Sequence, residues 1–330
     1  MDGTPLDRRD FLKHTLGAAV AAGLTAPGSP RAAAAEAAGP PASRPSQSLR
    51  PLRLGGPLFA GTSDPEELAL AHRKIGYRAA YCPKVELSDT DRIRDISRAY
   101  AKHDVVIAEV GRWCNLLDAD PGKRRENLKA VTDGLALAEA VGARCCVDIA
   151  GSYNPDVWYG PHPDNLSNRF FDAAVENARA IIDAVKPRRA KFCYEMMGWA
   201  VPDSPDSYLK LIRAVDRDGF GVHLDLCNLV NSPIRFYRNA ILLADCLDKL
   251  GPWIVSCHAK DLVWDVEMNI HFREVPAGSG QMDYAAWLRG IAGLDHEVPI
   301  MLEHCANEAE YDKARQYLLD LGKNIGVSFG

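Results

Sequence analysis

Short apolar runs alternate with longer amphipathic segments along the chain from residue 50 onward. The apolar runs are rich in Val, Ile, Cys and Ala, which is typical of strands buried on both faces of a parallel sheet. Eight of these runs predict strands, namely Leu52–Ala60, Ala79–Cys82, Val105–Val110, Cys145–Ala150, Phe192–Glu195, Val222–Leu226, Ile254–His258 and Ile300–Glu303. Because every connection is long enough for a parallel crossover, the pattern predicts eight successive βα units.

Residues that favour helix ends stand between these runs. Asp and Ser accept hydrogen bonds from the first turn of a helix, and Pro fits within that turn. Helices are therefore expected to begin at Ser63-Asp64-Pro65, Ser88-Asp89, Ser204-Pro205, Pro233, Asp283 and Asn307. Glycine readily adopts the left-handed conformation that ends a helix, which predicts helix ends at Gly142, Gly219 and Gly251.

Two α/β folds accept eight βα units in succession: a closed barrel and an open, doubly wound sheet. The open sheet would favour a glycine-rich phosphate turn after its first strand, and Gly55-Gly56-Pro57 is not a GxGxxG sequence. The number of units and the placement of polar residues described below favour the barrel. We therefore predict the α/β class, with a single (β/α)8 TIM barrel domain over residues 49–330.

The first 48 residues have the features of a targeting segment rather than of a folded domain. Arg8-Arg9 and Phe11-Leu12-Lys13 precede a modest apolar stretch, an alanine run at residues 32–35 and a Pro/Ala/Ser-rich linker. This order resembles a twin-arginine signal peptide, with Asp7 where Ser or Thr is usual. The apolar stretch is too short for a stable membrane span. We expect export by the twin-arginine machinery to the periplasm or beyond; a cytoplasmic enzyme with a disordered basic tail is the alternative.

Charge and cysteine content limit the function classes further. The net charge is −5 and no long basic run follows the N-terminus, which argues against a nucleic-acid partner. The nine cysteines form no CxxC pair, and several lie inside apolar runs, so we expect buried free thiols. A twin-arginine route, which carries proteins already folded, is compatible with free thiols in an exported protein.

Four predicted strands in succession, the fifth to the eighth, each end in one polar residue. These residues are Glu195, Asp225, His258 and Glu303. Carboxyl ends of barrel strands converge on one face, so the four side chains should meet there. Three buried carboxylates with one imidazole would repel each other without a cation. The pattern predicts a site for one divalent metal ion, Mn, Mg, Co or Zn.

The same residues lie within a set of phrases that resembles a known family. The phrases are Tyr194-Glu195, His223–Asn228, Cys257–Asp261, Pro276–Tyr284 and Leu302–His304. Residues 52–325 are similar to the xylose isomerase-like TIM barrel superfamily, and more closely to its sugar phosphate isomerase/epimerase branch, which includes ketose 3-epimerases and inosose dehydratases. The resemblance implies that all four residues bind the metal and that the two glutamates are catalytic acid/base groups.

Two departures from that family bear on the reaction. Asn228 stands where ketose 3-epimerases usually carry a histidine, and Trp264 lies near the position of their arginine. Both argue against simple ketose epimerisation. The second and third strand ends also lack the extra histidines of apurinic-site endonucleases, which makes that activity the weaker interpretation.

We expect an isomerase or epimerase that removes a proton next to a carbonyl of a carbohydrate, through a metal-stabilised ene-diolate. A lyase or dehydratase acting on a keto-sugar, keto-glycoside or cyclitol would share this intermediate and is the alternative. A non-catalytic sugar-binding barrel is the second alternative. The sequence leaves the substrate, the metal and the oligomeric state open, a homo-oligomer included.

Five further residues are predicted to contact the substrate: Asn228, Lys260, His271, Glu109 and Trp113. Lys260 follows His258 by two positions and could steady substrate oxyanions, although a lysine at the rim fits equally well. His271 lies on the long segment after the seventh strand. Glu109 and Trp113 follow the third strand as a candidate wall for sugar stacking. The long loop that carries Trp158 and Tyr159 suits a lid.

Overall fold

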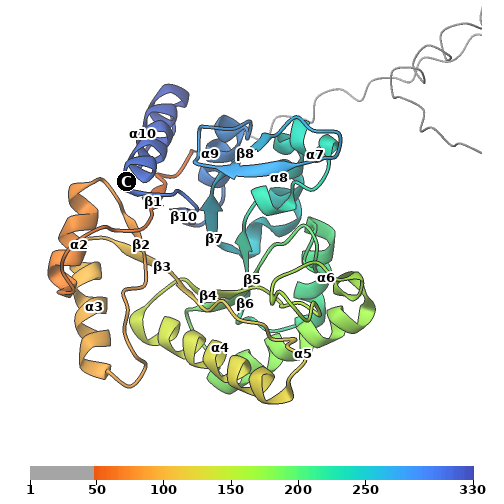
Figure 1. Ribbon diagram of the computed structural model, residues 1–330. Helices are drawn as coiled ribbons and strands as arrows, with labels where there is room; N and C mark the ends of the chain where they lie inside the picture. The colour runs from red at the N-terminus through yellow and green to blue at the C-terminus, as the bar shows by residue number, and fades with distance from the viewer. Residues whose placement is uncertain (1–47) are drawn as a thin grey trace, which may run out of the picture. The chain divides into compact units, whose positions relative to one another are not determined.

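Eight parallel strands close into a barrel in a computed structural model that describes residues 48–330 (Figure 1). The hydrogen-bonded order around the barrel is β1-β10-β7-β6-β5-β4-β3-β2. The strands are β1 Arg53–Gly55, β2 Ala79–Tyr81, β3 Val106–Gly111, β4 Cys145–Asp148, β5 Lys191–Glu195, β6 Phe220–Leu224, β7 Ile254–Ala259 and β10 Pro299–Leu302. The predicted barrel is therefore confirmed, and the predicted signal peptide lies outside the described residues.

One long helix follows each barrel strand and packs around the outside (Figure 1). These helices are α2 Pro65–Lys74, α3 Thr90–Lys102, α4 Pro121–Val141, α5 Asn168–Val185, α6 Pro205–Val215, α8 Asn239–Leu250, α9 Tyr284–Ala292 and α10 Glu308–Ile325. A short helix, α7 Pro233–Tyr237, precedes α8, and 3-10 turns lie at Pro163–Leu166, Cys227–Leu229 and Gly251–Trp253. Within residues 48–330, no helix has the length and apolarity that crossing a bilayer requires.

Most of the predicted helix ends are confirmed. The side chains of Asp64, Asp89, Ser204, Asp283 and Asn307 each accept a hydrogen bond from the first turn of their helix. Gly142 ends α4 in the left-handed conformation, with φ 81°. The predicted end at Gly219 is wrong, because α6 stops at Val215 and Asp216 takes the left-handed conformation instead. The helix predicted to start at Pro233 breaks at Arg238 into α7 and α8.

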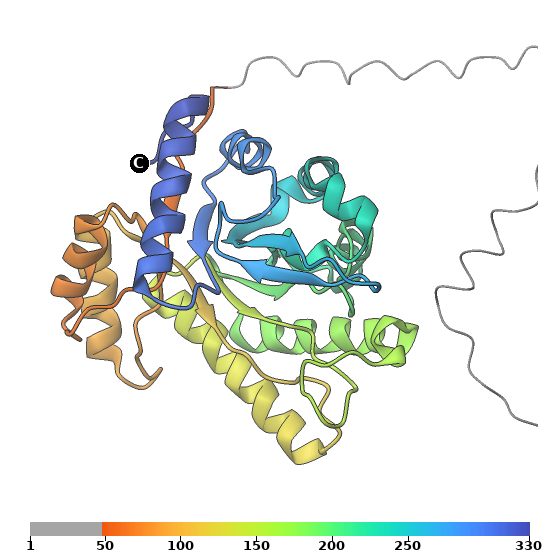
Figure 2. The ribbon, with the colours of Figure 1, turned by 45° about the horizontal axis from the view of Figure 1, so that its top comes forward.

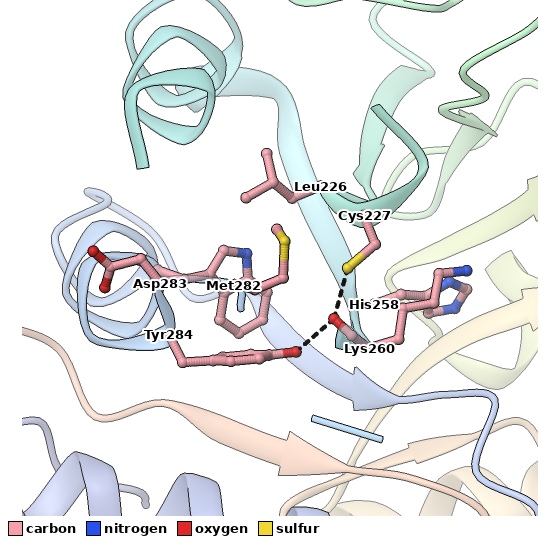
Figure 3. A pocket seen from close by; sticks show the side chains of 8 residues that line it. Leu226, Cys227, His258, Lys260, Met282, Asp283 and Tyr284 are labelled. Atoms are coloured by element: carbon pink, nitrogen blue, oxygen red, sulfur yellow. Dashed lines mark hydrogen bonds between the residues drawn. The ribbon is translucent and has the colours of Figure 1, made fainter. Parts of the chain in front are cut away.

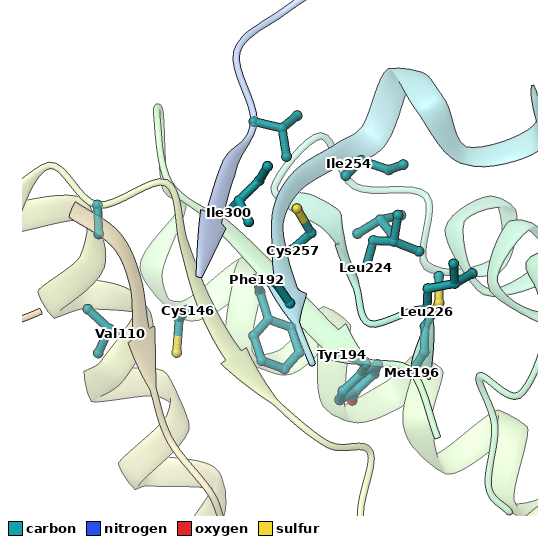
Figure 4. Close-up of a cluster of buried hydrophobic side chains, with 14 of the residues drawn as sticks. Val110, Cys146, Phe192, Tyr194, Met196, Leu224, Leu226, Ile254, Cys257 and Ile300 are labelled. Carbon is teal, nitrogen blue, oxygen red and sulfur yellow. The ribbon is translucent and has the colours of Figure 1, made fainter. Parts of the chain in front are cut away.

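Alternation along the strands decides which side chains enter the barrel. Phe192 and Tyr194 of β5, and Leu224 of β6, belong to the large apolar cluster drawn in Figure 4. The intervening positions on these strands carry the polar residues Glu195 and His223, which lie in the barrel interior. Because successive side chains of a strand point to opposite faces, one face packs against the helices and the other builds the site.

A β-hairpin replaces the long loop expected after the seventh strand. Strand β8 (Asp261–Trp264) pairs antiparallel with β9 (Phe272–Val275). The hairpin packs beside α7 (Figure 2), where the ring of Phe272 stacks on Phe236 with centroids 4.9 Å apart. Trp264 packs against the same phenylalanine at 5.9 Å, so this residue is part of an aromatic contact.

All nine cysteines are free, and six of them are buried, as predicted from their position in apolar runs.

Candidate functional site

Four side chains converge at the carboxyl ends of neighbouring strands, and we call them the donor cluster: Glu195, Asp225, His258 and Glu303. Each offers one donor atom, and these atoms lie within 4.8 Å of one another. Nδ1 of His258 is 2.8 Å from Glu195 Oε1, 3.1 Å from Glu303 Oε2 and 3.7 Å from Asp225 Oδ2. The structure therefore brings together all four residues that were predicted to bind a metal.

The chemistry of the donor cluster fits a divalent cation. Asp225 is fully buried, and its Oδ2 lies 2.9 Å from the ammonium group of Lys260. Three carboxylates packed this closely carry more negative charge than one ammonium group balances, and a bound divalent cation would offset the excess. Three carboxylates and one imidazole are donors that Mn, Mg, Co and Zn accept. These four residues would hold the ion.

The two glutamates of the donor cluster differ in their acidity. Burial raises the pKa of Glu195 to about 7, although the nearby charge of His258 opposes this effect. Burial acts in the same direction on Glu303, but there the charge of His258 and a hydrogen bond to it prevail and lower the pKa to about 2. Two carboxyl groups in one site therefore have separate proton affinities, which is a common arrangement in acid–base pairs.

Lys260 is a buried ammonium group that touches the donor cluster. Its Nζ lies 2.9 Å from Asp225 Oδ2, 3.0 Å from Glu303 Oε2 and 3.4 Å from Glu274 Oε1. Burial alone would lower the pKa of Lys260, but Asp225 and Glu303 raise it well above its ordinary value. Lys260 is therefore charged and lies inside the site rather than on a solvent-facing rim.

The main chain of Lys260 is held from the opposite side (Figure 3). Its carbonyl oxygen accepts a hydrogen bond from Cys227 Sγ at 2.7 Å and another from Tyr284 Oη at 2.8 Å. Neither donor was predicted as a site residue. Each side chain has one thiol or hydroxyl group on an otherwise apolar body and lies in an apolar run, so a sequence pattern gives no signal for this supporting role.

Glu274 and His304 are two further site residues that the sequence analysis missed. Nδ1 of His304 hydrogen-bonds Glu274 of β9, and Nε2 lies 3.4 Å from Glu303 Oε1. The bond to Glu274 raises the pKa of His304. His304 has a φ of 56°, a conformation that non-glycine residues adopt mainly where the surroundings hold them in it. The hairpin thus reaches the site through Glu274.

Glu109 lies beneath the donor cluster and is not one of the residues that line the cavity above this cluster. It is only 1% exposed. Its Oε1 is 3.2 Å from Nε2 of His258, and its Oε2 accepts a hydrogen bond from Ser256 Oγ at 3.2 Å. A carboxylate can only accept, so Nε2 donates to Glu109. Nδ1 lies 2.8 Å from Glu195 Oε1 and would give up its own hydrogen to bind a cation. Glu109 therefore orients the histidine.

His223 completes this lower layer. Its ring lies edge-on to His258 with centroids 4.1 Å apart, and Nδ1 is 3.5 Å from Glu109 Oε2. Burial lowers the pKa of His223 to about 4, so the ring is neutral at neutral pH. Glu109, His223 and His258 also bring donor atoms within 4.8 Å of one another, but none of the three lines the cavity above.

Replacing Glu109 with glutamine is expected to weaken divalent-metal binding by about 10–100-fold, because the neutral amide holds the histidine ring less firmly and makes it less basic. Competition with a fluorescent chelator measures this affinity. Ser256→Ala is the matched control, since it removes a hydrogen bond to Glu109 and leaves the bond to His258. Equal affinity of Glu109→Gln and wild type would show that the carboxylate has no orienting role.

A cavity of about 520 Å³ opens above the donor cluster. Of the predicted substrate contacts, Trp113, Asn228 and Lys260 line it, and so do both glutamates of the donor cluster. Trp158 and Tyr159 of the predicted lid also line it. Further lining residues without a prediction are Ile149, Met197, Trp199, Glu274 and His304.

His271 was predicted as a substrate contact and is not one of the residues that line this cavity. It lies in the exposed turn between β8 and β9, where Nδ1 is 3.9 Å from Glu267 Oε1. The prediction placed this residue on a long loop, and the structure has a β-hairpin there with His271 in its exposed turn.

A family model described as xylose isomerase-like TIM barrel matches residues 70–321. No curated protein matched the chain. Among solved structures, a xylose isomerase-like TIM barrel protein from Mycobacterium smegmatis in complex with magnesium is 18% identical. Its TM-score is 0.57, over 79% of this chain and 88% of that one.

Two other similar structures are named as enzymes. A 3-keto-D-glucoside 4-epimerase from E. coli is 13% identical with a TM-score of 0.57, over 82% of this chain and 99% of that one. A probable 3-DHS dehydratase from Bacillus anthracis is 15% identical with a TM-score of 0.58. The match covers 81% of this chain and 98% of the dehydratase chain. At such identities the likeness shows a shared fold, and the named reactions belong to those proteins.

Proposed function

Because the chain belongs to the xylose isomerase-like TIM barrel family, we propose that it is a divalent-metal-dependent isomerase or epimerase acting on a carbohydrate. One observation carries the proposal. Glu195 and Glu303 belong to the donor cluster and also line the cavity. A substrate in the cavity would therefore meet two carboxyl groups next to the cation site, which is what proton transfer beside a carbonyl requires.

The residues of the site have separate tasks in this reaction. When bound, a divalent ion supplies Lewis-acid polarisation of the substrate oxygens. One of the two glutamates removes the proton next to the carbonyl and leaves an ene-diolate. The other returns a proton to the opposite face, which inverts the carbon. The ammonium group of Lys260, beside Glu303, stabilises the negative charge that develops on the substrate oxygens.

A lyase is the second candidate, because elimination passes through the same ene-diolate. If a hydroxyl or glycosyl oxygen on the next carbon leaves, one glutamate acts as base and the other protonates the leaving oxygen. Asn228 favours this candidate, since it lines the cavity in place of the histidine usual in ketose 3-epimerases. The amide can hydrogen-bond a substrate oxygen but cannot move a proton at neutral pH.

Incubation of the manganese-loaded protein with 3-keto-glucosides and ketohexoses in D2O tests the proposal. We expect deuterium to enter the carbon next to the carbonyl, and we expect a chelator to stop this exchange. Exchange with formation of an epimer by NMR supports the epimerase. Exchange with formation of an ultraviolet-absorbing enone supports the lyase. No exchange with any of these substrates, despite about one bound ion per chain, would favour a non-catalytic sugar-binding barrel.

A further inference from the structure

Most of the charged and most of the aromatic lining residues form two separate groups, and β5 with the segment after it adds Glu195 and Trp199. The charged group contains Lys260 after β7, Glu274 of β9 and Glu303 after β10. The opposite group of lining residues comes from the segments after β3 and β4. It contains three large aromatic side chains, Trp113, Trp158 and Tyr159, which we call the aromatic wall.

The aromatic wall is partly exposed to solvent in the described part of the chain. Trp113 is 44% exposed, Trp158 is 37% exposed and Tyr159 is 52% exposed. The rings of Trp158 and Tyr159 meet edge to face at 5.2 Å. Exposed aromatic surface concentrated at the mouth of one cavity is costly in water and is typical of a ligand-contacting surface.

The loop that carries Trp158 and Tyr159 is firmly held. Buried Asn165 donates from Nδ2 to the carbonyl oxygen of Gly160 at 3.1 Å and to Ser152 Oγ at 3.0 Å. Ser152 Oγ in turn donates to the same carbonyl oxygen at 2.6 Å. These bonds fix the loop immediately after the two aromatic residues. A surface held in place before binding loses little conformational entropy when a ligand stacks on it.

Trp113 is positioned by a close approach to the main chain. A Cβ added at Gly111 would lie 2.8 Å from Nε1 of Trp113, so the indole occupies the space that any other residue would need. Gly111 therefore allows the ring to lie against the end of β3. This contact offers a way to displace the indole without removing it.

The charges of the cavity disfavour an anionic substrate. Within residues 48–330, Lys260 is the only Lys or Arg that lines the cavity. Its ammonium group is surrounded by the three carboxylates of Asp225, Glu274 and Glu303. Apart from a cation held by the donor cluster, a phosphate group would meet no unpaired Lys or Arg among the described lining residues, and it would meet several carboxylates.

We propose that the substrate is an uncharged glycoside with two rings, an inference that rests on the proposed function. The sugar ring to be deprotonated lies at the donor cluster, and the second ring stacks on the aromatic wall. An aryl aglycone and a second pyranose share the apolar ring face that such a wall recognises. The cavity of about 520 Å³ lies within the range that holds such a molecule.

Calorimetric titration of the manganese-loaded protein with four probes tests this inference. The probes are phenyl β-D-glucopyranoside, cellobiose, methyl β-D-glucopyranoside and glucose 6-phosphate. We expect phenyl glucoside or cellobiose, or both, to bind about 10-fold more tightly than methyl glucoside, which lacks the second ring. Tight binding of one two-ring probe alone identifies which kind of second ring the wall accepts. We expect glucose 6-phosphate to bind most weakly.

Two variants and a control complete the experiment. Trp113→Ala combined with Trp158→Ala is expected to remove the preference for two rings, and Gly111→Ala to reduce it by displacing the indole. Trp253→Ala is the matched control, because Trp253 is also 37% exposed but lies before β7, at the other end of the barrel. Equal binding of one-ring and two-ring probes, no binding of any probe, or a preference for the phosphate would overturn the inference.

The same preparations distinguish this inference from the proposed function. A two-ring preference without metal-dependent deuterium exchange would leave the aromatic wall as a binding site and reject the proposed reaction. Exchange on ketohexoses without a two-ring preference would support the reaction and reject the glycoside.

Discussion

Replacing Glu303 with glutamine is expected to lower the rate of epimer interconversion by about 10²–10⁴-fold at saturating manganese, the usual effect of losing a positioned acid or base. Glutamine keeps the shape and one oxygen donor but cannot carry the proton. In a two-base reaction the remaining Glu195 still removes the proton that faces it. The Glu303→Gln variant should therefore still exchange deuterium into one of the two epimers. The Glu195→Gln variant should exchange deuterium into the other epimer only. NMR of each epimer in D2O measures this.

Asp225→Asn is the control for this result. Asp225 belongs to the donor cluster but does not line the cavity, so its loss should weaken metal binding while high manganese restores exchange from both epimers. Elemental analysis of each variant separates missing metal from missing proton transfer. If manganese restored Glu303→Gln as fully as Asp225→Asn, Glu303 would be a ligand without an acid–base role.

Replacing Lys260 with methionine is expected to lower the free energy of unfolding of the metal-free protein by about 3–5 kcal/mol, the usual effect of removing one partner of a buried ion pair. Methionine fills a similar volume but leaves Asp225 and Glu303 without their ammonium partner at 2.9 and 3.0 Å. Saturating manganese should offset part of the loss, because the ion replaces the missing positive charge. Urea unfolding with a chelator and with manganese measures both effects.

Lys249→Met is the matched control for this stability change. Lys249 also contacts two carboxylates, at 2.7 Å from Asp206 and 3.0 Å from Asp245, but this cluster lies at the protein surface. Exposed ion pairs contribute about 0–1 kcal/mol, so we expect a small effect. Similar losses for the two variants, or a loss at Lys260 that manganese leaves unchanged, would contradict the role of Lys260 as counter-ion of the site.

The donor cluster could be predicted because its signal is local. Glu195, Asp225, His258 and Glu303 are single polar residues that end apolar runs, and parallel strands in a barrel carry their ends to one face. Glu109 has the same local signal, yet it lies one layer lower. In the structure Glu109 pairs with Cys145, whereas Asp148, three positions further along β4, pairs with Tyr194 beside Glu195. The register of the strands therefore decides that Glu109 lies below the donor cluster rather than within it.

The supporting residues lie beyond the reach of local patterns. Glu274 reaches Lys260 only because β9 pairs with β8 and folds back over the strand end. The same hairpin places His271 in its exposed turn, outside the cavity lining. The segment predicted to bring His271 into the site therefore brings Glu274 instead. The sequence shows the alternation of these strands but not the direction in which the hairpin points.

The sequence by itself determined the eight βα units, most helix ends and the four members of the donor cluster, since each follows from hydrophobic periodicity or from a residue's intrinsic preference. Only the tertiary structure decided that Glu109 supports His258, that Lys260 pairs with three carboxylates and that three aromatic side chains share one wall. The reason is physical. These relations depend on register and loop path, which are set by contacts between residues far apart in the chain.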